Sequence, residues 1–158
     1  MSRPTHSKSR LIILFLALCA VAIFYFYNSA KEVKSPNSEW KQTEIKVADK
    51  TLNVYLAQTP LETEVGLSAF QNISNNQGML FSFNPPQKPG FWMKDMKFSI
   101  DIIWVNNNQI VDITKNLSYQ DSGLIKYYPN VDISHAVEVN AGWCEKNSIK
   151  LGDSVEIR

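Results

Sequence analysis

Cysteine and histidine are scarce in this sequence, and their scarcity argues against two kinds of site. The 158 residues include two cysteines, Cys19 in an apolar run and Cys144 near the C-terminus. Two such cysteines do not form the framework of bridges that stabilises small disulfide-rich domains. After Trp40 the chain has a single histidine, His135. Because zinc sites are built mostly from several histidines and cysteines, no metal is expected.

Motifs that bind nucleotides or activate a serine nucleophile are also missing. The chain has no phosphate-binding loop, dinucleotide fingerprint or nucleophile-elbow sequence, so no cofactor is expected. A positive charge excess is missing as well, since from Trp40 onward eleven basic residues face thirteen acidic ones. A domain with this balance has no broad attraction for phosphate backbones, which argues against nucleic acid as a partner.

The most conspicuous feature that is present is a charge-free apolar run near the N-terminus. Residues 11–27 read LIILFLALCAVAIFYFY, and as a helix they would extend about 25 Å, near the lower limit for crossing a bilayer. The run ends in aromatic residues, which are typical of the membrane interface. Arg3, Lys8 and Arg10 precede it, and the positive-inside tendency keeps such an end in the cytoplasm. The membrane is therefore the first expected partner.

This interpretation divides the chain into four parts. Residues 1–10 form a cytoplasmic N-terminus, 11–27 a transmembrane anchor or uncleaved signal, 28–39 a polar linker, and 40–158 a β-rich globular domain. The protein is then a single-pass membrane protein whose domain is periplasmic or extracellular. The alternative is a cleaved signal peptide and a secreted domain, although the run exceeds the roughly 7–15 apolar residues of such peptides.

The domain is expected to be predominantly β. Short segments that alternate polar and apolar residues, or are strongly apolar, fill most of it, and long amphipathic helices are missing. The fold class is therefore α+β, a small mixed or antiparallel β-barrel with one or two short helices. The expected strands are residues 43–47, 51–57, 78–83, 91–93, 99–105, 109–114, 135–139 and 154–158.

Two short helices are expected beside these strands. The first opens at Thr59-Pro60, because Thr59 can accept from free backbone amides, Pro60 suits the first helical position and Glu62 completes a capping box. Its Leu61 is expected to face inward. Residues 141–148 form the second.

Two further segments have neither pattern. Residues 84–90 contain three prolines and are interpreted as a loop that cannot join the interior of a sheet. Residues 115–131 form a long polar stretch without clear periodicity, which we interpret as either functional or mobile.

Several motifs, taken in order, resemble those of a known family. They are Gly66-Leu67, Gly78-Met79-Leu80-Phe81, Phe91-Trp92-Met93-Lys94-Asp95 with Ile100-Asp101-Ile102-Ile103, Val137-Glu138-Val139 and Gly152-Asp153-Ser154-Val155. Over residues 45–158 they resemble the uncharacterised conserved family called domain of unknown function number 192. The resemblance implies a compact, largely β domain, often behind a signal peptide or an anchor. It implies no activity, because the family has none established.

The block from Phe91 to Asp101 is the first candidate for a ligand site. Neighbouring side chains in a strand point to opposite faces, so Phe91 and Met93 would share one face, and Trp92 and Lys94 the other. An aromatic ring beside a cation and carboxylates suits sugar rings and other half-apolar ligands. In the ordinary alternative, the apolar side chains fill the core and the charged ones form a solvated turn. The candidate ligand-binding residues are Trp92, Met93, Lys94, Asp95, Asp101 and Glu138.

Two of these residues, Asp101 and Glu138, are carboxylates flanked by apolar residues in predicted strands. Burying an unpaired carboxylate is costly. Asp101 must therefore be hydrogen-bonded, paired with Lys94, or exposed. Simple alternation predicts exposure, with a salt bridge or a capping role. A general acid or base in a cleft is the alternative. A Cys144–His135 nucleophile pair is disfavoured, because Cys144 follows a tryptophan in a short helix and is more simply a packing position.

Two functions of different classes are compatible with these features. The first is a membrane-anchored, envelope-facing binding or accessory module for a small molecule, a glycan or a protein, with its pocket at the Phe-Trp-Met-Lys block. The alternative is a carboxylate-dependent hydrolase or transferase acting on an envelope glycan or peptide. It requires Asp101 and Glu138 to converge at roughly 5–9.5 Å in one cleft. A third possibility is a structural partner of a membrane complex, with an exposed apolar patch. Catalytic residues are not assigned.

We expect the full-length chain to sediment with membranes and to stay there after a high-salt wash, because the apolar run is more stable in lipid than in water. Cell fractionation with immunoblotting measures this, and a version without residues 11–27 should move to the supernatant. Recovery of the intact chain from the cytosolic fraction would contradict the anchor.

Overall fold

A computed structural model of the chain describes residues 40–121, 123 and 125–157. The cytoplasmic N-terminus, the anchor at 11–27 and the linker at 28–39 expected from the sequence lie outside the described residues. Within the described part of the chain, no helix has the length and apolar character needed to cross a bilayer.

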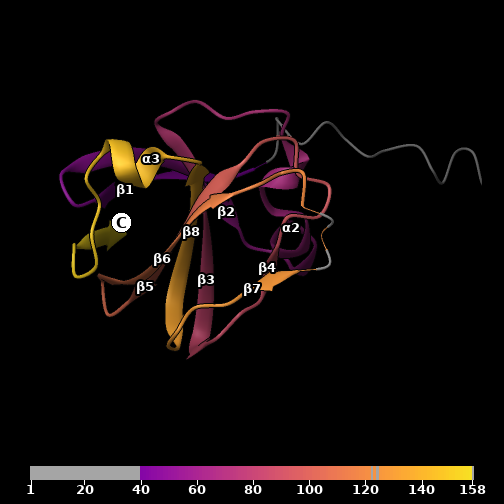
Figure 1. Cartoon of the computed structure of the whole chain (residues 1–158). Coiled ribbons are helices and arrows are strands. Elements are labelled where there is room, and N and C mark those ends of the chain that lie inside the picture. The colour runs from indigo at the N-terminus through magenta and orange to yellow at the C-terminus, as the bar shows by residue number, and fades with distance from the viewer. Residues whose placement is uncertain (1–39, 122, 124, 158) are drawn as a thin grey trace, which may run out of the picture. The chain divides into compact units, whose positions relative to one another are not determined.

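One seven-stranded sheet forms the frame of the domain (Figure 1). Its strand order is β6-β5-β8-β3-β2-β1-β9. The β2–β3 pair is parallel and the other neighbours are antiparallel, so the sheet is mixed. The strands are β1 (Gln42–Val47), β2 (Lys50–Ala57), β3 (Gln77–Gln87), β5 (Ile100–Asn106), β6 (Gln109–Leu117), β8 (Ile133–Asn140) and β9 (Val155–Ile157).

The sheet curls into a half-barrel. Its end strands approach each other at one place, where Gln109 forms an isolated bridge with Ser154 and the Val155 amide donates to the Asn108 carbonyl at 2.8 Å. Because β9 has three residues, it is too short to pair along the nine residues of β6. The prediction of a predominantly β fold with short helices is confirmed, and the expected barrel takes the form of this half-barrel.

The smaller elements connect the strands. They are α2 (Pro60–Val65), the 3₁₀ helix η2 (Gly66–Ala69), α3 (Trp143–Lys146), and a two-stranded ribbon of β4 (Phe91–Trp92) and β7 (Lys126–Tyr127). The ribbon is a sheet of its own. Figure 1 shows α2, β4 and β7 together on one side of the large sheet.

The start of α2 has the predicted capping box. The Thr59 hydroxyl accepts from the Glu62 amide at 3.2 Å, and the Glu62 carboxylate accepts from the Thr59 amide at 2.8 Å. The expectation that Leu61 faces inward is wrong, because its side chain is 69% exposed and this short helix contains no buried residue. The chain enters the core at Leu67 in η2, which is fully buried.

The central strands of the sheet are buried on both faces. One core cluster includes Leu80, Ile103 and Val137, while their neighbours Met79 and Ile102 belong to a second cluster that also contains residues of η2. All six residues from Ile100 to Val105 are buried. Successive side chains of such a strand point alternately into one core cluster and into the other, so neither face of the strand is in contact with solvent.

The expectation that Asp101 lies on an exposed face is therefore wrong. Its side chain is fully buried and accepts three backbone hydrogen bonds. One oxygen accepts from the amides of Asn116 at 2.8 Å and Gly142 at 3.2 Å, and the other from the amide of Cys144 at 3.0 Å. Lys94, the expected partner, is not in contact with it. Asp101 thus ties β5 to β6 and to the start of α3.

We expect Asp101→Asn to lower the free energy of unfolding by about 2–4 kcal/mol, because the new NH₂ group would face backbone N–H donors and leave them unpaired. Urea unfolding of the chain in detergent micelles measures the change. The control is Asp49→Asn, since the Asp49 side chain is 77% exposed and pairs with its neighbour Lys50. Equal stability of the two variants would contradict this role for Asp101.

Candidate functional site

A cavity of about 560 Å³ opens between α2 and the β4–β7 ribbon. The polar residues of α2 line one wall and the aromatic residues of β3 and β4 line the other. The lining includes Thr63, Glu64, Gly66, Leu67, Phe81, Phe83, Phe91, Trp92, Lys94, Met96 and Glu138.

Glu138 reaches the cavity from the middle of β8. Its neighbours Val137 and Val139 belong to the core inside the curl, so alternation turns Glu138 to the opposite face. The side chain is 4% exposed. Among the described residues its hydrogen-bond donor is the Leu67 amide, at 3.4 Å from one carboxyl oxygen. A carboxylate has about four acceptor positions, so most of the acceptor capacity of Glu138 is unused.

Burial changes the acidity of this carboxyl group. Removal from water raises the pKa of Glu138 from 4.5 to about 7, and the hydrogen bond from Leu67 opposes the shift. The other charged residues that line the cavity are Glu64 and Lys94. Glu138 therefore changes charge near neutral pH, in a place that is accessible to a ligand.

Aromatic rings hold β4 against the large sheet. The Phe91 ring lies edge-on to the Phe81 ring, with centroids 4.9 Å apart, and edge-on to the Trp104 ring at 5.1 Å. Edge-to-face pairs are favourable because the positive edge of one ring meets the negative face of the other. This packing makes Phe91 a fixed part of the cavity wall.

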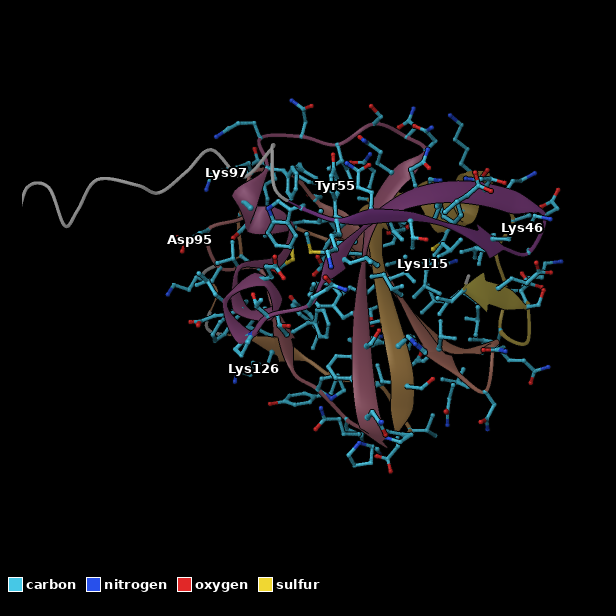
Figure 2. The ribbon with its side chains drawn as sticks, turned by 180° about the vertical axis from the view of Figure 1, so that it is seen from behind. Lys46, Tyr55, Asp95, Lys97, Lys115 and Lys126 are labelled. Atoms are coloured by element: carbon cyan, nitrogen blue, oxygen red, sulfur yellow. The ribbon has the colours of Figure 1, made fainter. Side chains whose placement is uncertain are left out.

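Two lysines flank the Trp92 ring. Lys126 lies opposite Trp92 in the ribbon, and its ammonium nitrogen is 5.2 Å from the ring centroid, while that of Lys94 is 5.9 Å away. Both distances are within the range of cation–π attraction. Figure 2 shows Lys126 on the side of the molecule that carries α2, with Lys46 on the opposite side.

The segment that carries Lys126 had no predicted structure. Residues 115–131 lack a pattern because β7 has only two residues, and side chains instead hold the segment in place. The Tyr127 hydroxyl donates to Asp121 at 2.6 Å, which raises the pKa of that hydroxyl. The Asp112 carboxylate accepts from the Asn130 amide at 3.0 Å and its side chain at 2.8 Å. These side-chain contacts join residues 6 and 18 positions apart, and neither spacing produces the polar–apolar alternation by which a strand is predicted.

The structure brings some of the predicted site residues together and separates others. Trp92, Lys94 and Glu138 line the cavity. Met93 does not, because it lies in the core cluster against which Phe91 also packs, and it is 1% exposed. Asp95 occupies an exposed turn with a φ of 60°. The sequence-based assignment missed Gly66, Leu67 and Phe81, and it placed Phe91 in the candidate block without listing it as a ligand-binding residue. The apolar character of these residues does not distinguish a cavity wall from a core.

Asp101 and Glu138 lie on opposite faces of the sheet. In the antiparallel β5–β8 pair, Asp101 is opposite Val139 and Ile102 is opposite Glu138. Directly opposed residues project to the same face, so the two carboxylates point away from each other. A catalytic pair that combines Asp101 with Glu138 in one cleft is thereby excluded.

Other reactive groups do not form a second centre. Among the described residues no group of three histidines, cysteines or carboxylates could hold a metal ion. Burial raises the pKa of the Cys144 thiol to about 12, so the thiolate is scarce. His135 lies near the start of β8 and Cys144 just beyond its end, so the two are not a nucleophile pair. Among the described residues, Glu138 is therefore the candidate reactive group of the cavity.

We expect Glu138→Gln to flatten the pH dependence of stability. Because the folded pKa is about 7 and the reference value 4.5, the wild type binds its proton more tightly when folded and loses stability as the pH rises between these values. The loss should reach roughly 1–3 kcal/mol at about pH 8 and be missing in the variant. Urea unfolding as a function of pH measures it. Glu156→Gln, at an exposed position on β9, should keep the wild-type slope, and an unchanged slope in Glu138→Gln would contradict this assignment.

Two solved structures have folds similar to that of this domain. No curated protein is significantly similar to the chain in sequence. A solved protein of unknown function from Novosphingobium aromaticivorans DSM 12444 superimposes with a TM-score of 0.72 at 27% identity, over 77% of this chain and 89% of its own. A solved putative transcription regulator from Sinorhizobium meliloti 1021 superimposes with a TM-score of 0.69 at 22% identity, over 74% and 94%.

These similarities agree with the sequence match. At 22% identity the second similarity concerns the fold alone, and the first structure has no stated function. The profile of one family matches residues 42–157, which is nearly the whole described domain. The chain therefore belongs to the family described as uncharacterised ACR, domain of unknown function 192.

Proposed function

We propose that the domain is a ligand-binding module of the cell envelope, held at the membrane by residues 11–27, and that the cavity at Glu138 is its binding site. The observation that carries the proposal is a largely buried carboxyl group that lines an aromatic-walled cavity and accepts one long hydrogen bond, from the Leu67 amide. Its other oxygen is open to the cavity, because no fully buried side-chain oxygen of the described residues lacks a hydrogen-bond partner. A ligand in the cavity would donate a hydrogen bond to this oxygen in place of water.

The size and lining of the cavity support this proposal. Its volume of about 560 Å³ lies within the roughly 300–1,000 Å³ typical of small-molecule sites. Apolar walls with a few well-placed polar groups are typical of such sites, because the walls supply affinity and the polar groups supply orientation. Here Phe81, Phe91 and Trp92 supply the apolar surface, while Glu138 and Lys94 supply the polar groups.

The location of the ligand follows from the sequence. An anchor at 11–27 preceded by basic residues would place the domain on the periplasmic or extracellular side. Small molecules, glycans and peptides of the envelope are then the ligands within reach. Aromatic rings accept the apolar faces of sugars and the side chains of peptides alike.

A carboxylate-dependent hydrolase or transferase is the second candidate. Glu138 favours it, because a carboxyl group with a pKa of about 7 can both give and take a proton near neutral pH. The second carboxylate would be Glu64, which lines the same cavity, in place of Asp101. Conversion of a bound glycan or peptide into new products would favour this candidate.

We expect the full-length chain in nanodiscs to bind at least one member of a panel of cell-wall fragments, oligosaccharides and short peptides. Trp92→Ala should weaken binding about tenfold or more, because truncating an aromatic wall removes buried contact area. Isothermal titration calorimetry measures the affinity, and product analysis of the same samples detects turnover. The control is Tyr119→Ala, an exposed aromatic residue outside the cavity lining. Absence of binding across the panel, or equal affinity in Trp92→Ala, would contradict the proposal.

A further inference from the structure

We propose that the ligand group bound at Glu138 is an organic cation, an ammonium or guanidinium group, carried on an apolar body that lies against the aromatic wall of the cavity. This inference rests on the proposed binding function and names the chemistry of the ligand. Four observations lead to it.

The first observation is that Glu138 lacks a cationic partner. Among the described residues it takes part in no ion pair, and its one hydrogen bond, from the Leu67 amide, is long at 3.4 Å. A buried carboxylate is stabilised most by a cation that also donates hydrogen bonds. The protein therefore presents one half of an ion pair inside the cavity.

The second observation is the charge of the lining. Glu64 and Glu138 contribute two carboxyl groups and Lys94 contributes one ammonium group, so the wall carries a net charge of −1 when all three are ionised. Lys94 is exposed, and its ammonium nitrogen lies 5.9 Å from the Trp92 ring centroid. Neither lysine beside Trp92 occupies the position next to Glu138.

The third observation is the space above the carboxyl group. A Cβ atom added at Gly66 would lie 3.5 Å from Oε2 and 4.0 Å from Oε1 of Glu138. A side chain at this position would cover the carboxyl oxygens on the cavity side. Gly66 has a φ of 54°, a conformation that glycine adopts without strain, and it leaves the approach to both oxygens open for a ligand group.

The fourth observation is the chemistry of the walls. The faces of aromatic rings are negative and attract cations within about 6 Å, while they also accept hydrocarbon. Phe81 and Phe91 line the cavity near Glu138, together with the soft thioether of Met96. Such walls suit an alkyl or aryl ammonium ion better than a strongly hydrated anion.

The predicted pH dependence distinguishes a cation from other ligands. The other titratable groups that line the cavity are Glu64 from α2 and Lys94 after β4, whereas the neighbours of Glu138 across β3 and β5, Met79 and Ile102, do not titrate. A cation binds the ionised carboxylate, so its affinity must fall as the pH drops through about 7. A ligand that offers only a hydrogen-bond acceptor needs the protonated form of Glu138, so its affinity must rise as the pH drops.

The test uses three probes that share one apolar body: 4-phenylbutylamine, 4-phenylbutanol and 4-phenylbutyrate. Each is titrated calorimetrically into the full-length chain in nanodiscs of zwitterionic lipid, and heats from empty nanodiscs are subtracted. At about pH 8 the amine should bind about tenfold more tightly than the alcohol, and the acid should bind most weakly. At about pH 5.5 the affinity for the amine should fall on the order of tenfold.

Matched variants locate the effect. Glu138→Gln should remove both the preference for the amine and its pH dependence, and Glu156→Gln, the same change at an exposed position on β9, should preserve both. Lys94→Gln should raise the affinity for the amine about two- to threefold, because it removes a like charge from the wall. The pH dependence of the wild type needs no substitution, so the inference can be tested even if Glu138→Gln does not fold.

The outcomes separate this inference from the proposed function. Equal or tighter binding of the alcohol or the acid, or an amine affinity that rises at about pH 5.5, would overturn the cation and leave a binding site in place. Absence of binding by all three probes would also overturn the inference. Whether the domain binds any ligand is tested separately, with the panel of cell-wall fragments, oligosaccharides and short peptides.

Discussion

Burial of both faces of the central strands is the constraint on which the rest of the structure depends. β3, β8 and β5 separate two apolar clusters, one inside the curl and one beneath η2 and β4. A charged side chain in the doubly covered part of these strands is therefore withdrawn from water, and such a group must find a partner or lose its charge. The buried charged residues, Asp101 and Glu138, both lie in these strands.

The two carboxylates meet this constraint in different ways. Asp101 accepts from the amides of Asn116, Gly142 and Cys144, so its acceptor positions are used within the protein and its role is structural. Glu138 accepts from the amide of Leu67 alone, at 3.4 Å, and its remaining acceptor positions face a cavity. Where the first arrangement stabilises the fold, the second leaves free energy available for binding.

Local sequence patterns predicted the parts of the fold that depend on neighbouring residues. The strands β1 and β2 and the capping box of Thr59 and Glu62 were predicted correctly because their signals come from residues close in the chain. The exposure of Asp101 was predicted wrongly, since alternation assumes one face in water. The alternation expected for Phe91 and Met93 agrees with the structure, since both contribute to one core cluster, but alternation does not show how deeply Met93 is buried.

The candidate site could be predicted only in part for a similar reason. Trp92, Lys94 and Glu138 were recognisable by residue type, since an aromatic ring, a cation and a carboxylate in apolar strands are unusual. Phe81 and Phe91 are residues of the kind found in any core. They form a cavity wall only because the Phe91 ring of the ribbon packs edge-on against the Phe81 ring of β3. β7 has two residues, and the contacts of Tyr127 and Asn130 that position it depend on the completed fold.

The separation of the ribbon from the large sheet affects what the cavity can hold. β4 and β7 bond to each other and form no ladder with β3 or β8, so the packing of the Phe91 ring on Phe81 and Trp104, and no backbone ladder, holds β4 on the large sheet. The shape of the aromatic wall therefore depends on the size and edge-to-face geometry of these rings. Substitutions at Phe81 or Phe91 would change which guests the cavity admits while the hydrogen-bonded frame stays the same, which would let a single scaffold serve a series of related molecules.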